Sequence, residues 1–254
     1  MSVPAAETYN ALVPSVGRWL LLLLLAAAAV AQGRGRGVVR TDTDRYKRTR
    51  MAWGGSLPKP EELATAPSQG DPRRKPLLVY VPSSLRSNDQ ARFEEVVFEN
   101  ESFVVAARFF DCVQAAEASV RSHPLFEGLK WEAPAIVVID SSRQTREVAH
   151  ARASAMKAVD LMRMVGQPDY ETDMNETLRK AKVLLGTFDQ IDAARDALKI
   201  KRARVENALA KGDKAKAAVL EKDCDRDEEQ MKELIRKTER EWDGLFDLKI
   251  KKAS

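Results

Sequence analysis

The chain has 254 residues, of which 44% are hydrophobic and 6% aromatic, so it can form one or two domains with largely aliphatic cores. It contains only two cysteines, which excludes a small scaffold held together by several disulfides. The formal net charge is +4, and residues 32–76, with 11 Lys/Arg and 5 Asp/Glu, carry most of the basic character.

The first 31 residues have the pattern of a secretory signal peptide. Arg18 precedes an apolar run with six consecutive leucines, and Ala29-Val30-Ala31 supplies the small-x-small cleavage pattern. We therefore expect an exported protein, periplasmic or extracellular, whose mature chain begins at Gln32. The run is shorter than the roughly 20 apolar residues that span a bilayer. An uncleaved membrane anchor is the alternative.

Residues 32–74 are basic and rich in proline, and they show no hydrophobic periodicity. Such a composition offers little apolar surface to offset the entropy of ordering, so we predict a flexible linker. Its basic side chains suggest weak contact with an anionic surface. These side chains are Arg34, Arg36, Arg40, Arg45, Lys47, Arg48 and Arg50. A solvated linker is the simpler interpretation, and export disfavours nucleic acid as a partner.

Residues 75–166 have the pattern of an α/β domain. Short apolar runs predict buried strands at 76–81 and 135–139, with further strands at 108–114 and 146–151. Ser87 and Gln90 form an S-x-x-Q capping box before a helix predicted over 91–107. A closing amphipathic helix is predicted over 154–165.

This order of elements, with Pro134 directly before the third apolar run, resembles the thioredoxin fold. It is most similar to the branch in which a Cys-x-x-Cys motif is followed by Val-Phe-x-Asn/Asp, which matches Val97-Phe98-Glu99-Asn100. The resemblance implies a central mixed sheet with flanking helices and a cis peptide bond before Pro134. The motif positions carry Ser87-Asn88-Asp89-Gln90 instead of two cysteines, so we do not expect the redox chemistry of that family.

The same resemblance implies a groove that holds extended peptide. It places Ser84, Ser87, Trp131, Ala133 and Pro134 around this groove. We therefore hypothesise a peptide-contacting patch without redox chemistry. An ordinary packed loop is the alternative.

The two cysteines and two histidines give no metal or cofactor signature. Cys112 lies in the predicted strand 108–114, where a lone cysteine is typically a small buried apolar residue. The sequence leaves open whether Cys112 and Cys224 are free or paired. His123 and His150 lack the spacing of zinc ligands, so we predict neither a metal nor a cofactor.

Residues 169–252 have the pattern of long helices. Apolar residues recur at three- and four-residue spacing over 172–211 and again over 214–250. Gly212-Asp213 between them combines a helix-ending glycine with a capping aspartate. We predict an antiparallel helical hairpin. A single continuous rod that dimerises as a coiled coil is the alternative.

Together these patterns predict an exported, non-catalytic, thioredoxin-like protein that works as a protein-interaction or scaffold module. The hairpin would bind a protein partner or mediate self-association. A thiol-disulfide oxidoreductase or peroxide-handling enzyme that uses Cys112 is the second interpretation. A chaperone-like binder of unfolded clients is the third.

Overall fold

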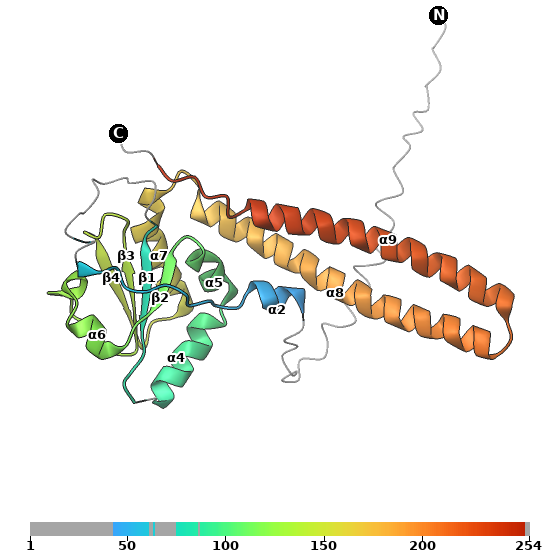
Figure 1. Ribbon diagram of the computed structural model, residues 1–254, viewed down its shortest axis with the longest axis horizontal. Helices are drawn as coiled ribbons and strands as arrows, with labels where there is room; N and C mark the ends of the chain where they lie inside the picture. Colours follow the sequence, from blue (N-terminus) through green and yellow to red (C-terminus); the bar gives the residue numbers. More distant parts are fainter. Residues whose placement is uncertain (1–42, 61–62, 64–74, 86, 252–254) are drawn as a thin grey trace, which may run out of the picture.

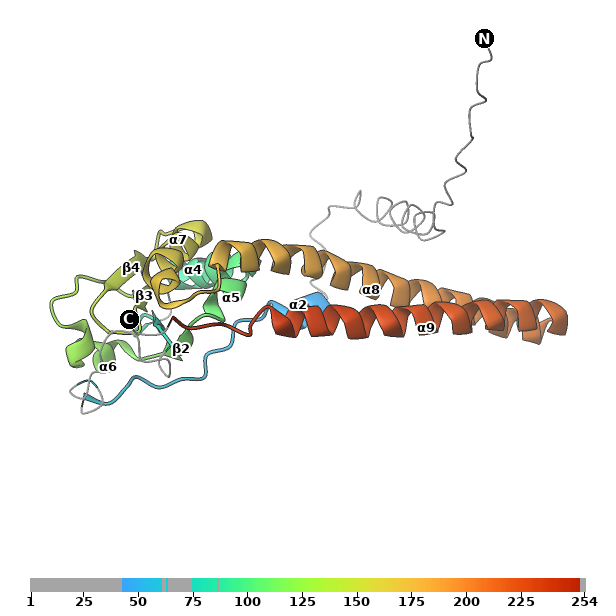
Figure 2. The same ribbon diagram turned by 90° about the horizontal axis from the view of Figure 1, so that it is seen from above.

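The computed structural model describes residues 43–60, 63, 75–85 and 87–251, and it consists of an α/β domain from which two long helices project (Figures 1 and 2). The predicted signal peptide lies outside the described residues. Within the described part of the chain, no helix is long and apolar enough to cross a membrane.

A four-stranded mixed sheet forms the centre of the α/β domain. The strands are β1 (Leu77–Val81), β2 (Asp111–Gln114), β3 (Ala135–Ile139) and β4 (Arg146–His150), arranged in the order β2-β1-β3-β4. β1 pairs with β2 in parallel, whereas β3 pairs with β1 and β4 in antiparallel fashion. Every residue of β1 and β3 is buried, as expected for the two central strands of a sheet that is covered on both faces.

The helix predicted over 91–107 is in fact two helices, α4 (Asn88–Phe98) and α5 (Glu101–Ala107). The helix is interrupted at Asn100, whose side chain accepts a hydrogen bond from the Phe103 N–H and caps α5. An asparagine competes well for a cap position because its side-chain oxygen satisfies a free backbone donor of the new helix. The break lets α5 bury all of its last five residues.

Two buried clusters cover the two faces of the sheet. The larger cluster joins β1 and β3 to α4, α5 and α7 (Ala155–Gly166). The smaller cluster lies on the opposite face, with α6 (Glu117–Arg121) and the short 3-10 helix η1 (Pro124–Phe126). A second 3-10 helix, η2 (Gln167–Asp169), then leads out of the domain.

The two long helices form an antiparallel hairpin, not a continuous rod. α8 (Met174–Ala210) and α9 (Lys214–Gly244) are joined at Gly212, which has a φ of 75°, and Asp213 caps α9. Near the α/β domain the hairpin has an apolar core in which Phe188 and Trp242 pack edge to face. Farther out, its buried residues are sparse: Leu198, Ala208, Ala217 and Cys224.

The chain returns to the α/β domain after α9. Tyr170 forms an antiparallel bridge with Ile250, and the Lys251 N–H donates to the Asp169 carbonyl at 3.0 Å. Both ends of the hairpin are therefore attached to the domain.

Residues 43–60, which we call the strap, differ from the flexible linker expected over 32–74. They contain the helix α2 (Asp44–Arg48) and an extended segment that follows the free edge of β2. Trp53 packs on Tyr80 and Phe98, with ring centroids 5.5 and 5.1 Å apart. These contacts are made with residues distant in the sequence, so composition gave no sign of them. The remaining residues of the predicted linker lie outside the described part, apart from Leu63.

Candidate functional site

The tip of α4, where the resemblance placed a redox motif, is a polar cap. The Ser87 hydroxyl accepts a hydrogen bond from the Gln90 N–H at 3.1 Å, which is one half of the predicted capping box. The other half is absent, because the buried Gln90 side chain turns inward. It accepts from the Ser83 N–H at 3.2 Å and donates to Glu94 at 2.8 Å. The tip thus has hydroxyl and amide groups at the start of a helix, and no thiol.

The register of the sheet places the loop that leads from β1 to α4 at the same end of the sheet as Pro134. Val81 at the end of β1 lies opposite Ala135 at the start of β3. The loop after β1 and the loop before β3 therefore leave the sheet at the same end. The Ala133–Pro134 peptide bond is cis, and Pro134 itself is buried. In the loop before the tip, Leu85 is 82% exposed. Ser84, Ser87, Asn88 and Asp89 are exposed as well.

Trp131 does not form an open rim beside this edge. It is only 9% exposed and belongs to the smaller buried cluster. The Arg121 guanidinium lies over its ring, 4.7 Å from the centroid. Trp131 therefore packs as a core residue.

Cys112 is held as a neutral thiol. Its Sγ lies 3.3 Å from the Ala107 carbonyl, toward which it can donate. Burial, reinforced by the neighbouring Asp111 carboxylate, raises the pKa of the Cys112 thiol to about 12. Cys224 is buried in the hairpin, and both cysteines are free. The nucleophilic thiolate is therefore scarce at Cys112 near neutral pH.

His123 has a structural partner. Its Nε2 lies 2.8 Å from the Pro58 carbonyl of the strap, and its Nδ1 accepts from the Leu125 N–H at 3.2 Å. Among the described residues, no three His, Cys, Asp or Glu side chains are grouped so that they could hold a metal ion.

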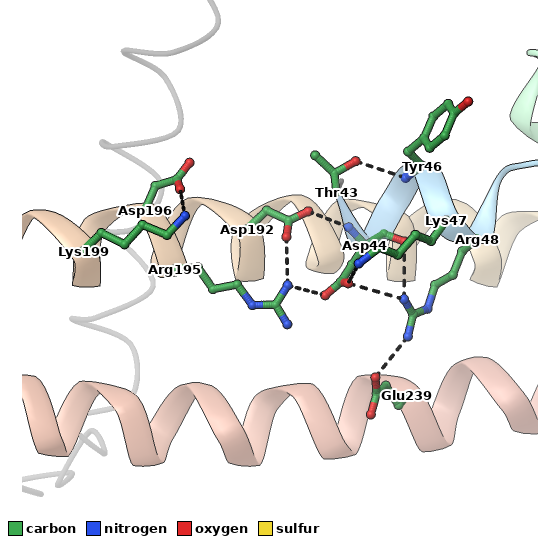
Figure 3. Close-up of polar contacts among 10 residues, drawn as sticks. All are labelled: Thr43, Asp44, Tyr46, Lys47, Arg48, Asp192, Arg195, Asp196, Lys199 and Glu239. Carbon is green, nitrogen blue, oxygen red and sulfur yellow. Dashed lines mark hydrogen bonds and ion pairs between the residues drawn. The ribbon is translucent and has the colours of Figure 1, made fainter. Parts of the chain in front are cut away.

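The strap is fastened to the hairpin by ion pairs centred on Asp44 (Figure 3). The Asp44 carboxylate accepts from Arg195 of α8 at 2.6 Å, and its backbone N–H donates to Asp192 at 3.0 Å. Arg48 pairs with Glu239 of α9 at 3.1 Å and lies over the Phe188 ring, 3.9 Å from its centroid. One short helix therefore contacts both arms of the hairpin.

The strap also ties the hairpin to the α/β domain. Arg45 donates to both carboxylate oxygens of Glu101 on α5, at 2.5 and 2.6 Å, and pairs with Asp189 on α8. The Arg48 carbonyl accepts from Arg108, which follows α5. Charge-assisted, bidentate pairs of this kind are geometrically specific, so the strap fixes how α5 and α8 meet.

The basic residues predicted to contact an anionic surface therefore divide into three groups. Arg45 and Arg48 form ion pairs with Glu101 and Glu239, and the Lys47 Nζ lies 3.7 Å from the Asp44 Oδ1. Arg50 is exposed. Arg34, Arg36 and Arg40 lie outside the described residues. The sequence signal for the docked helix was Thr43 before Asp44, since Thr43 caps α2 by accepting from the Tyr46 N–H.

Two grooves border the strap. One, of about 840 Å³, lies between the strap and α4, where Trp53 and Phe98 form part of its wall. The other, of about 770 Å³, lies between the strap and β2, and Cys112 is one of its lining residues. Both volumes are in the range of ligand pockets.

No protein-family model, curated protein or solved structure matches this chain. Its function is therefore argued from its own residues.

Proposed function

We propose that this chain is an exported, thioredoxin-like protein without thiol redox chemistry that acts through protein contacts, as an interaction or scaffold module. Three features support the thioredoxin-like assignment. They are the strand order β2-β1-β3-β4, the parallel pairing of β1 with β2, and the cis bond before β3.

The observation that carries the proposal is the chemistry of the α4 tip. A helix N-terminus stabilises a thiolate and makes a cysteine there nucleophilic. Here the capping group is the Ser87 hydroxyl, which donates nothing to redox exchange and is occupied by the Gln90 N–H. The edge beside Pro134 can then offer shape, backbone groups and the exposed Leu85 side chain, which are means of binding and not of catalysis.

The properties of Cys112 weigh against the alternative enzyme. A peroxidatic or disulfide-exchanging cysteine needs a lowered pKa, whereas the pKa of Cys112 is raised to about 12. Cys224 lies on α9 about 30 Å along the helix from its Gly244 end, at 1.5 Å per residue, so it cannot resolve a Cys112 intermediate in the same chain.

A turnover assay tests the non-catalytic part. We expect the purified chain to show no insulin-disulfide reduction and no peroxide consumption above buffer, with or without Cys112→Ser. Turnover that disappears in the Cys112→Ser variant would overturn the proposal in favour of the enzyme.

Two exposed apolar side chains allow the binding part to be tested without disturbing the core. Leu85 is 82% exposed beside the α4 tip, and Val219 is 64% exposed near the far end of the hairpin. We propose chemical crosslinking in the exported fraction with wild type, Leu85→Asp and Val219→Asp. We expect the wild type to form a discrete crosslinked species that is lost in Leu85→Asp and kept in Val219→Asp. The reverse pattern would assign recognition to the hairpin. A crosslinked species that persists in both variants would show that neither Leu85 nor Val219 lies in the binding surface.

The export part has its own test. Mass spectrometry of the protein recovered from its producing cells should give an N-terminus at Gln32. A chain that retains residues 1–31 would instead support the membrane anchor.

A further inference from the structure

The groove between the strap and α4 has an aromatic side and an acidic side. Trp53 and Phe98 are half-buried, and their rings meet at 66° with centroids 5.1 Å apart. Tyr46 of α2 also lines the groove. The exposed faces of such rings attract cations, and a guanidinium can stack on them.

The acidic side comes from one face of α4. Glu95 and Glu99, four residues apart, both line the groove and are both exposed. Glu94 accepts from Tyr80 and Gln90, and Glu101 is engaged by Arg45. Among the described residues, by contrast, no hydrogen bond or ion pair reaches the Glu95 or Glu99 carboxylate.

This placement of Glu95 and Glu99 is unfavourable for α4 alone. Like charges four residues apart repel one another on a helix surface. Glu99 is also the C-cap residue, where the helix dipole disfavours a negative charge. A cation that enters the groove from outside would relieve both effects at once.

We propose that this groove binds an extended segment of a partner protein through an arginine side chain. The guanidinium stacks on Trp53 and pairs with Glu95 and Glu99, because its planar fork suits a stacked, doubly carboxylate-bound position better than the compact ammonium of lysine. Arg50 also lines the groove and can donate hydrogen bonds to backbone carbonyls or carboxylates of the same segment. This site goes beyond the proposed function, since it shares no residue with the α4 tip, and either can fail without the other.

The experiment uses immobilised seven-residue peptide pools in which the central residue is fixed as Arg, Lys, Gln or Glu and the other positions are randomised. The fraction of full chain retained is measured. We expect the arginine pool to retain at least tenfold more protein than the glutamine pool. The net charge of the chain is +4, so non-specific attraction would instead favour the glutamate pool. Equal retention by the arginine and glutamine pools, or preference for glutamate, overturns the proposal.

Matched double variants assign the effect to the groove. Glu95→Gln/Glu99→Gln should reduce retention by the arginine pool to the level of the glutamine pool. Glu206→Gln/Glu221→Gln removes the same charge from exposed positions on the hairpin and should leave retention unchanged. Equal losses in both variants would show a general charge effect and overturn the site.

A third variant tests whether the occupant is the chain itself. Thr43 lines the groove and follows a segment that carries three arginines. If Arg34→Gln/Arg36→Gln/Arg40→Gln increases retention by the arginine pool tenfold or more, that segment competes for the groove, and the assignment to a partner protein is wrong. Unchanged retention supports the partner.

Discussion

At the scale of single residues, the strap depends on how closely its backbone approaches β2. The N–H groups of Gly54 and Gly55 both donate to the Cys112 carbonyl, at 3.2 and 3.0 Å. A Cβ at Gly55 would lie 2.9 Å from a Val113 methyl and 3.3 Å from the Cys112 carbonyl oxygen, whereas at Gly54 it would meet nothing within 4 Å. Two adjacent glycines therefore have different roles.

This contrast predicts the effect of adding one methyl group. Gly55→Ala should lower the free energy of unfolding by about 1–3 kcal/mol, because β2 or the strap must shift. Gly54→Ala is the control and should change it by less than about 0.5 kcal/mol. Urea unfolding followed by circular dichroism measures both. Equal effects would show that the strap does not lie against β2 in solution.

The raised pKa of Cys112 predicts a low reactivity. A thiol with a pKa of about 12 is almost fully protonated at pH 8, whereas an exposed thiol titrates near pH 8.5. Iodoacetamide should therefore modify Cys112 roughly a thousandfold more slowly in the folded chain than in urea, as peptide mass mapping can follow. Comparable rates in the two states would contradict the buried thiol.

The same pKa shift fixes the sign of a pH effect on stability. Since the pKa is higher in the folded state, the neutral thiol stabilises the fold below about pH 8.5, and this contribution is lost as the pH rises toward 12. Cys112→Ala should unfold with a shallower loss of stability over that window than the wild type. A steeper loss in the variant would reverse the assigned sign.

At the scale of elements, the strap is the part that joins the others. Asp44 is only 9% exposed and lies among Arg195, Arg48 and Lys47. Removal of a buried carboxylate that lies among cations is costly, because it leaves those cations partly buried without an anionic partner.

Asp44→Asn should therefore lower the free energy of unfolding by about 2–4 kcal/mol. Asp160→Asn removes the acid of an exposed pair with Arg163 on α7, and we expect a change below about 1 kcal/mol. Both can be measured by thermal and urea unfolding at low salt. A loss in Asp160→Asn as large as that in Asp44→Asn would indicate a general charge effect instead of a buried pair.

The sequence predicted the elements whose signal is local. The apolar run at 135–139 predicted β3 with the same bounds as in the structure, and Gly212-Asp213 predicted the turn of the hairpin. The break at Asn100 was missed because the helical periodicity continues across it. The strap was missed because its composition is that of a linker. Its order arises from pairs such as Arg45 with Glu101, which no local pattern reveals.

The sequence predicted only the part of the candidate site that depends on local spacing. The Ser87 cap could be read from its spacing to Gln90, and the structure contains that hydrogen bond. The inward turn of the Gln90 side chain and the burial of Trp131 depend on packing between segments that are distant in the sequence. The sequence therefore did not indicate the first, and it left Trp131 open between a peptide-contacting patch and a packed loop.

At the scale of the whole molecule, the hairpin changes character along its length. Near the α/β domain, α8 and α9 enclose a continuous apolar core that includes Val105 of α5. Over 195–232 they are held by few buried side chains and by the pairs Lys201–Asp227 and Arg202–Glu228. Exposed ion pairs add little to stability, so the far half should open more easily than the near half.

Hydrogen exchange tests this gradient. Backbone amides over 198–228 should exchange at least tenfold faster than those over 181–191 and 234–242, because local opening there breaks fewer apolar contacts. The amides of β1 and β3 serve as the internal reference for slow exchange. Uniform protection along both arms would show that another contact supports the far half.

The docking of α2 also constrains the order in which the chain can mature. Asp44 and its partner Arg195 are 151 positions apart, and Arg48 and Glu239 are 191 positions apart. At a translation rate of about 5–20 residues per second, the ribosome adds Glu239 roughly 10–40 seconds after Arg48. In a nascent polypeptide, α2 consequently lacks its partners on α8 and α9 until synthesis is nearly finished, and products truncated before α9 cannot form the Arg48–Glu239 pair.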